Sequence, residues 1–242
     1  MPLFLASVRD AEEADLAIRA GADIIDLKDP AQGALGALPG EAIGACVRCV
    51  AGRTPVSATI GDLPLRGDGA ASAVRATAAL GVEYVKLGLF PGSDPSFRLD
   101  LGSRGSNGFR LILVLFADAL PDFDPIPFAA RIGASGLMFD TLGKGSGTLT
   151  DHLPCAELAE HVAAARASRL TVGFAGSLGP EALPHLLALE PDLLGFRGAL
   201  CRNGDRLQPL DPVRLASVRA LIPGHSRDLA QNMPDLAPQA LC

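Results

Sequence analysis

The stretch ADIIDLKDP, residues 22–30, reads as a short buried strand that ends in charged residues. Its apolar positions are interrupted by Asp26 and closed by Lys28. Successive side chains of a strand point to opposite faces, so Asp26 and Lys28 share one face. The sequence therefore predicts a strand over residues 23–28 that presents a carboxylate and an amine on the same side near its carboxyl end.

Similar apolar runs recur along the chain and alternate with helix-like segments. The predicted strands cover residues 3–6, 23–28, 55–60, 83–89, 110–117, 136–140, 170–175 and 193–197, and the predicted helices cover 11–19, 41–50, 70–80, 125–132, 155–167, 181–189 and 211–220. Strands that alternate with helices form a parallel sheet, and eight such units close as a (β/α)8 TIM barrel at about this chain length. The alternative is a doubly wound sheet, although the chain lacks the early GxGxxG that often accompanies it.

Two segments depart from this alternation. Residues 91–108 are rich in Gly, Pro and Ser and show no helical period, so we expect the helix after the fourth strand to be shortened or lost. The chain is expected to form a single barrel domain over residues 1–222, followed by a C-terminal tail over residues 223–242. That weakly patterned tail is a candidate for assembly, which leaves a homo-oligomer open.

Composition narrows the classes of partner. The chain has 242 residues, 48% of them hydrophobic, a net charge of −6 and no block of basic residues, which argues against nucleic acid and membranes as partners. The amino-terminal segment lacks a basic leader, so we expect a cytoplasmic protein. Cys46 and Cys49 form an isolated CxxC and the histidines show no ligand spacing, so we expect no metal.

Lysine is rare in this chain. Among 21 basic residues only Lys28, Lys86 and Lys144 are lysines, and they lie on or just after the second, fourth and sixth predicted strands. Arginine serves where only a solvated positive charge is needed, whereas a lysine amine can lose its proton and act as a nucleophile or base. Side chains from alternate strands of a barrel meet in one layer. The three amines should therefore converge on one pocket.

Carboxylates accompany these amines. Asp26 shares a face with Lys28, Asp140 ends the sixth predicted strand and Asp118 follows the fifth, so all should lie at the mouth of the same barrel. An amine beside a carboxylate in a confined site is suited to Schiff-base formation and proton transfer. The alternative is a set of buried ion pairs with a structural role only.

A phosphate site is expected after the last two strands. Gly176 and Ser177 follow the seventh strand, just before a predicted helix, and Arg197 and Gly198 follow the eighth. Backbone amides freed by glycine, a helix start and an arginine at this place form the usual phosphate site of such barrels. The alternative is that these glycines only allow the chain to turn.

Several of these motifs together resemble a known family. They are GADIIDLKDPAQGALGA (21–37), VSATIGDLP (56–64), YVKLGL (84–89), FDTLGKGSGTLTDHL (139–153), AGSL (175–178) and GFRGALC (195–201). In this order they are similar to the (5-formylfuran-3-yl)methyl phosphate synthases, also called 4-(hydroxymethyl)-2-furancarboxaldehyde-phosphate synthases. The resemblance implies a TIM barrel that condenses two glyceraldehyde 3-phosphate molecules, releases phosphate and water, and forms the furan precursor of methanofuran.

The resemblance also implies roles for individual residues. The Schiff-base lysine of the family falls on Lys28 and its proton acceptor on Lys86, with Asp26, Asp140 and Lys144 as further active-site groups. The partner would be a small triose phosphate, and no metal or organic cofactor is implied. Two alternatives remain open at this point: another Schiff-base aldolase barrel that acts on a sugar phosphate, and a non-catalytic barrel that binds a phosphorylated metabolite.

Overall fold

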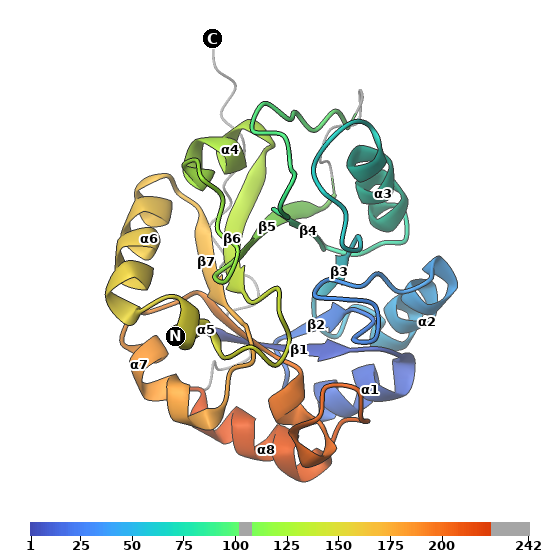
Figure 1. The fold of residues 1–242 in the computed structure, drawn as a ribbon. Helices are drawn as coiled ribbons and strands as arrows, with labels where there is room; N and C mark the ends of the chain where they lie inside the picture. Colours follow the sequence, from blue (N-terminus) through green and yellow to red (C-terminus); the bar gives the residue numbers. More distant parts are fainter. Residues whose placement is uncertain (102–107, 224–242) are drawn as a thin grey trace.

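The computed structural model describes residues 1–101 and 108–223 and contains a closed barrel of eight parallel strands (Figure 1). Each strand pairs with the next one along the chain, and β8 pairs with β1 to close the ring. The strands are β1 Leu3–Val8, β2 Ile24–Leu27, β3 Val56–Thr59, β4 Tyr84–Gly88, β5 Arg110–Phe116, β6 Ala134–Asp140, β7 Thr171–Phe174 and β8 Leu193–Phe196. The predicted (β/α)8 barrel is therefore confirmed, and the doubly wound alternative is wrong because the sheet has no open edge.

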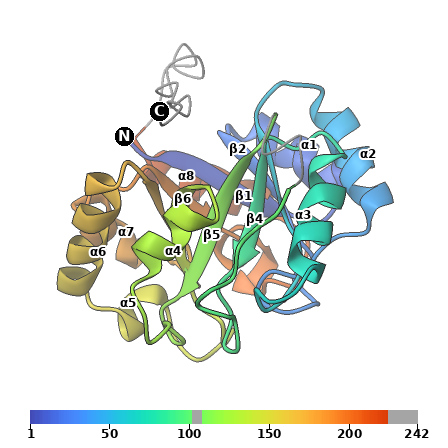
Figure 2. The same ribbon diagram turned by 90° about the horizontal axis from the view of Figure 1, so that it is seen from above.

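Helices cover the outside of this barrel, as Figures 1 and 2 show. They are α1 Ala11–Arg19, α2 Gly40–Val50, α3 Gly69–Ala78, α4 Pro125–Arg131, α5 Leu149–His152, α6 Cys155–Ala167, α7 Leu183–Leu187 and α8 Pro212–Leu221, with short 3-10 turns at Pro180–Ala182, Gly198–Leu200 and Arg202–Gly204. Their starts follow the sequence: α1, α4 and α8 each begin after an aspartate whose side chain accepts backbone N–H groups of the first turn. In the described residues, none of these helices is long and apolar enough to span a membrane.

The connection from β4 to β5 lacks a helix in its described part, residues 89–101 and 108–109, in agreement with its predicted loss. Turns replace it, and Phe97 is buried against the core that the helices elsewhere share with the strands. Arg131 of α4 donates through Nε to the Phe97 carbonyl at 3.4 Å, which ties this connection to the next unit. Residues 102–107 of the predicted irregular segment and all but the first residue of the predicted tail lie outside the described residues.

Two apolar cores stabilise the barrel. The larger core lies between the strands and the surrounding helices, and the smaller one lies inside the ring of strands. The inner core includes Leu35 of the loop after β2 together with Phe90 and Phe116, whose ring centroids are 4.7 Å apart. These bulky side chains fill the mouth of the barrel near β4 and β5, so the open space at the mouth lies toward the other strands.

Candidate active site

The carboxyl ends of the strands surround a cavity of about 510 Å³. Catalytic residues of TIM barrels lie at this end, where the loops after the strands meet. The cavity brings together most of the predicted site residues, namely Lys28, Lys86, Asp140, Lys144, Gly176, Ser177, Arg197 and Gly198. The three lysines thus line one cavity although they come from three separate βα units.

Asp26 lies directly behind this cavity and pairs with Lys86. The Asp26 side chain is fully buried, accepts hydrogen bonds from the hydroxyls of Ser7 (2.8 Å) and Ser57, and lies 2.6 Å from the Lys86 Nζ. Strand register places Ser7 and Ser57 on either side of Asp26 at one level of the barrel. Burial alone would raise the pKa of Asp26, but the charges of Lys86 and Lys28 lower it below its ordinary value, so the carboxylate stays ionised.

This pairing differs from the simplest sequence interpretation, in which Asp26 accompanies Lys28 on the same strand face. Lys86 comes from β4, two strands away from β2, and its amine reaches the Asp26 carboxylate across the barrel interior. Alternate strands supply the side chains of one layer, so inward groups of β2 and β4 meet more closely than groups at different levels of β2. Asp26 therefore orients the Lys86 amine.

Asp140 and Lys144 form the second ion pair of the cavity. The Lys144 Nζ lies 2.7 Å from the Asp140 Oδ1 and also donates to the carbonyl of Thr141 and, at 3.3 Å, to its hydroxyl. Asp140 further accepts from the Thr141 backbone N–H at 2.7 Å. Burial would raise the pKa of Asp140, but the charges of Lys144 and Lys28 lower it. The three N–H donors of the Lys144 ammonium thus all have protein acceptors.

Lys28 differs from the other two lysines. It lies just beyond β2, is 7% exposed, and donates a single long hydrogen bond of 3.4 Å to the Ala34 carbonyl. Within residues 1–101 and 108–223, no carboxylate oxygen lies within 4.0 Å of its amine. Burial lowers the pKa of Lys28 to about 8, with the charges of Lys144 and Lys86 acting in the same direction and those of Asp140 and Asp26 opposing them. About a tenth of the amine is then neutral at pH 7.

The loop after β2 holds the Ala34 carbonyl beside this amine. Asp62, in the loop after β3, accepts hydrogen bonds from the backbone N–H groups of Ala34 (3.0 Å) and Leu35 (2.7 Å). The Thr59 hydroxyl donates to the Gly36 carbonyl at 2.9 Å. Sequence reasoning overlooked this clamp because Asp62 follows a strand without any lysine.

The predicted phosphate loops line the same cavity. Gly176 and Ser177 follow β7 with positive φ angles of 94° and 53°, the left-handed region that glycine adopts without strain. A Cβ added at Gly176 would lie 3.0 Å from the Thr141 backbone nitrogen, so this turn packs closely on the loop after β6. Gly198 begins the 3-10 turn after β8. These two turns present backbone to the cavity from adjacent strands.

The predicted role of Arg197 as a phosphate ligand is not supported by its contacts. Its guanidinium forms a buried two-pronged ion pair with Glu13 of α1 and also donates to the backbone carbonyls of Ser7 (3.2 Å), Arg206 (2.9 Å) and Gln208 (3.0 Å). All five N–H groups of a guanidinium are occupied by such a set, which leaves none for a phosphate. Arg197 therefore fixes the backbone around the cavity instead of contacting a ligand in it.

Asp118 follows β5 as predicted, but it holds a neighbouring loop instead of lining the cavity. It does not line the cavity, and its carboxylate accepts from the backbone N–H groups of Leu142 and Gly143, both at 2.7 Å. Burial would raise the pKa of Asp118, but these hydrogen bonds lower it. Asp118 thus holds the loop after β6 in the shape that presents Lys144.

Two arginines of the cavity were missed by the sequence analysis. Arg206 and Arg214 line it from the region after β8. Most basic residues of this chain are arginines, and neither position belongs to a recognisable motif, so no signal separated these two from solvated surface charges. In the part of the chain that is described, no group of three His, Cys, Asp or Glu side chains could hold a metal ion.

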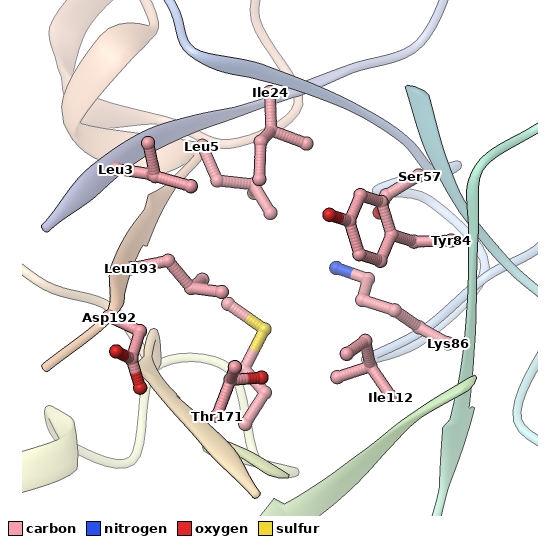
Figure 3. A pocket seen from close by; sticks show the side chains of 11 residues that line it. Leu3, Leu5, Ile24, Ser57, Tyr84, Lys86, Ile112, Thr171, Asp192 and Leu193 are labelled. Carbon is pink, nitrogen blue, oxygen red and sulfur yellow. The ribbon is translucent and has the colours of Figure 1, made fainter. Parts of the chain in front are cut away.

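A smaller cavity lies inside the barrel on the amino-terminal side of the first (Figure 3). Leu5, Lys86 and Met138 line both cavities, so Lys86 stands between them. Figure 3 shows the side chains of Tyr84 and Lys86 extending together from β4 into this space. The Lys86 and Asp26 side chains are 4% and 0% exposed, so water screens the charges of this pair little.

Comparison with known proteins fits this arrangement of lysines in a barrel mouth. The profile of the family described as 4-HFC-P synthase matches residues 4–219. The chain belongs to the 4-HFC-P synthase family. A Methylorubrum extorquens protein provisionally named (5-formylfuran-3-yl)methyl phosphate synthase is 44% identical over 95% of both chains. The (5-formylfuran-3-yl)methyl phosphate synthase of Methanopyrus kandleri is 36% identical over 85% of this chain and 92% of its own.

Solved structures of other barrels show the same fold at lower identity. Phosphoribosyl anthranilate isomerase from Thermus thermophilus superposes with a TM-score of 0.65 at 19% identity and covers 91% of this chain and 98% of its own. A 3-hexulose-6-phosphate synthase reaches 0.56 at 16% identity, with 92% and 100% coverage. At these identities the likeness concerns the fold, whereas the family membership makes the chain an enzyme of the synthase type.

Proposed function

We propose that this synthase condenses two molecules of glyceraldehyde 3-phosphate into 4-(hydroxymethyl)-2-furancarboxaldehyde phosphate through a Schiff base on Lys28. The names of its relatives support the product, which would serve as the furan precursor of methanofuran. The observation that carries the covalent role is the state of the Lys28 amine, which is buried, lacks a carboxylate partner among the described residues and has a pKa of about 8. Such an amine is available as a nucleophile near neutral pH.

The first step uses Lys28 alone. Its neutral amine attacks the carbonyl carbon of one triose phosphate, and loss of water leaves an iminium in which the nitrogen carries the positive charge. That charge acidifies the adjacent carbon, which can then lose a proton and add to the carbonyl of the second triose phosphate. Elimination of phosphate and water and closure of the ring would give the aromatic furan, and hydrolysis of the imine would free Lys28 and leave the furan aldehyde. Formation of the aromatic ring makes the overall reaction favourable.

The other charged groups divide the remaining work. Lys86 lines the cavity and is held by Asp26 at 2.6 Å, so we assign it the proton transfers of enamine formation and dehydration. Lys144 acts through its charge, which lowers the pKa of Lys28, while Asp140 opposes that effect and fixes Lys144 in place. None of these steps requires a metal or an organic cofactor.

One phosphate would bind at the loops after β7 and β8. Gly176 and Ser177 face the cavity from one loop and Gly198 from the next. Backbone N–H groups and the start of a 3-10 turn offer an anion several hydrogen-bond donors, and Arg214 lines the cavity beside the loop after β8. Anchored there, a triose phosphate would be held within the cavity that Lys28 lines.

The decisive experiment incubates the protein with glyceraldehyde 3-phosphate alone and follows the furan chromophore and released phosphate. We expect both to appear, and we expect borohydride to trap a covalent adduct that peptide mapping places on Lys28. The variant Lys28→Arg keeps a positive charge but cannot form the imine and should lose both signals. Lys144→Arg serves as the matched control, because it should still form the adduct.

Two other outcomes would point to different functions. An adduct on Lys28 without any furan would indicate another aldolase-type reaction on a sugar phosphate. Saturable binding without an adduct would indicate a barrel that binds its phosphorylated ligand without covalent catalysis. A folded protein that forms neither furan nor phosphate would contradict the proposed activity.

A further inference from the structure

Arg206 occupies an unusual position at the mouth of the cavity. It follows the 3-10 turn after β8, lines the cavity, and is half-buried. One Nη2 hydrogen bond, of 2.9 Å, joins it to the Gly33 carbonyl in the loop after β2. In residues 1–101 and 108–223 its guanidinium has no carboxylate within 4.0 Å and no other hydrogen-bond acceptor. Four of its five N–H groups are therefore available to a ligand.

Hydrogen bonds from buried side chains hold the backbone around Arg206. The buried guanidinium of Arg197 donates to the Arg206 carbonyl at 2.9 Å and to the Gln208 carbonyl at 3.0 Å. Glu13, the partner of Arg197, also accepts from the Leu210 backbone N–H at 3.2 Å. The Arg197–Glu13 pair therefore fixes the segment over residues 206–210 and determines where Arg206 projects.

Arg206 also lies close to the reacting groups. Burial lowers the pKa of its guanidinium, and the charge of Asp140 is the main effect opposing that shift, which places the guanidinium in the field of the cavity carboxylate. On the loop after β2, the Gly33 carbonyl accepts from Arg206 and the adjacent Ala34 carbonyl accepts from Lys28. The Arg206 guanidinium and the Lys28 amine thus donate to the carbonyls of two consecutive residues in one loop.

The proposed reaction brings two phosphate groups into one cavity, and the loops after β7 and β8 account for one of them. Arg214 belongs to that first site, because its Nη1 contacts the Ala199 carbonyl beside Gly198 at 3.5 Å. Lys86 and Lys144 are each paired with an aspartate, and the Lys144 donors are saturated. The second phosphate therefore needs a cation elsewhere in the cavity.

We propose that Arg206 binds the phosphate of the second glyceraldehyde 3-phosphate, the one not held by the loops after β7 and β8. This assignment rests on the proposed function. A guanidinium presents two parallel N–H groups that match two phosphate oxygens, and it keeps its charge when partly buried. Arg206 is thus a residue that determines specificity for a phosphorylated second substrate, and Arg197 is the residue that positions it.

The test compares Arg206→Met and Arg206→Lys with Arg202→Met, a matched control at an exposed arginine of the same segment that does not line the cavity. Binding of inorganic phosphate is measured by calorimetry, and kcat and KM are measured for glyceraldehyde 3-phosphate. We expect wild type to bind two phosphates and Arg206→Met to weaken one of them about 10- to 100-fold, the loss of a charge-assisted hydrogen bond. KM should rise by a similar factor, Arg206→Lys should lie between, and Arg202→Met should match wild type.

Two phosphates bound equally well by Arg206→Met and wild type, or a KM that does not change, would overturn the assignment. If Arg206→Met lowers the thermal midpoint of unfolding, Arg206→Lys decides, because it keeps the charge but offers no two-pronged contact. The phosphate titration tests the Arg206 site independently of activity. If wild type forms no furan, the proposed function is contradicted, but phosphate binding still shows whether Arg206 holds a phosphate.

Discussion

Lys28 carries a buried amine that no neighbouring carboxylate neutralises in the described residues, and this state has a direct consequence for pH dependence. Imine formation needs the neutral amine, so kcat/KM for furan formation should rise with pH, about tenfold per pH unit, and level off above the pKa of about 8. The pH profile of kcat/KM in wild type checks this expectation. A rate that falls as the pH rises toward 8 would contradict it.

Two variants should move this profile in opposite directions. The charge of Asp140 raises the pKa of Lys28, so Asp140→Asn should shift the rising limb to lower pH. The charge of Lys144 lowers that pKa, so Lys144→Met should shift the limb to higher pH. Both variants are compared with wild type by kcat/KM across the same pH range. If the rising limb of kcat/KM stays at the wild-type pH in both variants, Lys28 is not the titrating group.

The same amine should destabilise the folded protein. The pKa of Lys28 falls from 10.5 to about 8 on folding, so the unfolded chain binds the proton more tightly than the folded protein. This difference lowers the free energy of unfolding, by its full amount below pH 8. We expect Lys28→Met to raise the free energy of unfolding by about 2–3 kcal/mol at pH 7. Urea titrations measure this value. Lys144→Met is the control, because loss of its ion pair with Asp140 should destabilise instead.

That stability gain should vanish at high pH. Between about pH 8 and 10.5 the amine of the folded wild type is already neutral, whereas the unfolded chain still binds a proton, so wild-type stability rises relative to Lys28→Met. Urea titrations of both proteins across this range follow the difference. A constant difference between them would show that packing, and not the charge, explains the effect of the substitution.

Sequence alone identified the lysines and missed the arginines for a common reason. Lysine is scarce in this chain, so each lysine on or just after a predicted strand stood out, and all three line the cavity. Arginine is abundant, so Arg197 was singled out only by its place after the eighth strand. Its burial and its pairing with Glu13 depend on a contact between the first and last units of the barrel, which no local pattern records.

At the scale of elements, the loop after β6 depends on Asp118. Its carboxylate holds the backbone N–H groups of Leu142 and Gly143, and Lys144 follows directly. We expect Asp118→Asn to lower the free energy of unfolding by about 1–3 kcal/mol, the typical cost of losing hydrogen bonds to a charged group. Asp122→Asn, at an exposed aspartate of the same connection, is the control and should behave as wild type.

A change in stability would not by itself show that Asp118 positions Lys144. A displaced Lys144 no longer lowers the pKa of Lys28, so the rising limb of kcat/KM in Asp118→Asn should move to higher pH, as in Lys144→Met. This shift is measured on folded protein below its thermal midpoint. An unmoved limb in a destabilised variant would limit Asp118 to a structural role.

The elements themselves were predictable wherever an apolar run was long enough. All eight strands lie within a few residues of their predicted places, because fully buried parallel strands read as continuous apolar segments. The short helix α5, of four residues, was missed, and α7 is shorter than predicted because a 3-10 turn replaces its start. Neither segment is long enough to show a helical period.

At the scale of the whole molecule, Glu13 and Arg197 join the first unit of the barrel to the last. Both side chains are buried, and each would be left as an unpaired charge without the other. Glu13→Gln should lower the free energy of unfolding by about 3–5 kcal/mol, the usual cost of breaking a buried ion pair. Thermal and urea unfolding measure the loss, and Glu12→Gln on the exposed face of α1 should leave stability unchanged.

Closure of the barrel was the most predictable property of the molecule, and the shape of its mouth was the least. Eight alternating units were sufficient to predict a ring of strands. The side chain of Leu35 enters the inner core with Phe90 and Phe116, and that packing decides which part of the mouth stays open. Such packing between loops of different units has no signature in any single segment.

The charges around the cavity do not balance. Three lysines and three arginines line it. Among the described residues, four carboxylates line it or pair with these cations, namely Glu13, Asp26, Asp140 and Asp205. The protein groups around the cavity therefore carry excess positive charge, and a phosphate ester would act as their counter-ion. A bound substrate would then neutralise part of this charge and stabilise the folded protein as well as react in the cavity. The thermal midpoint of unfolding should therefore be highest when substrate is bound.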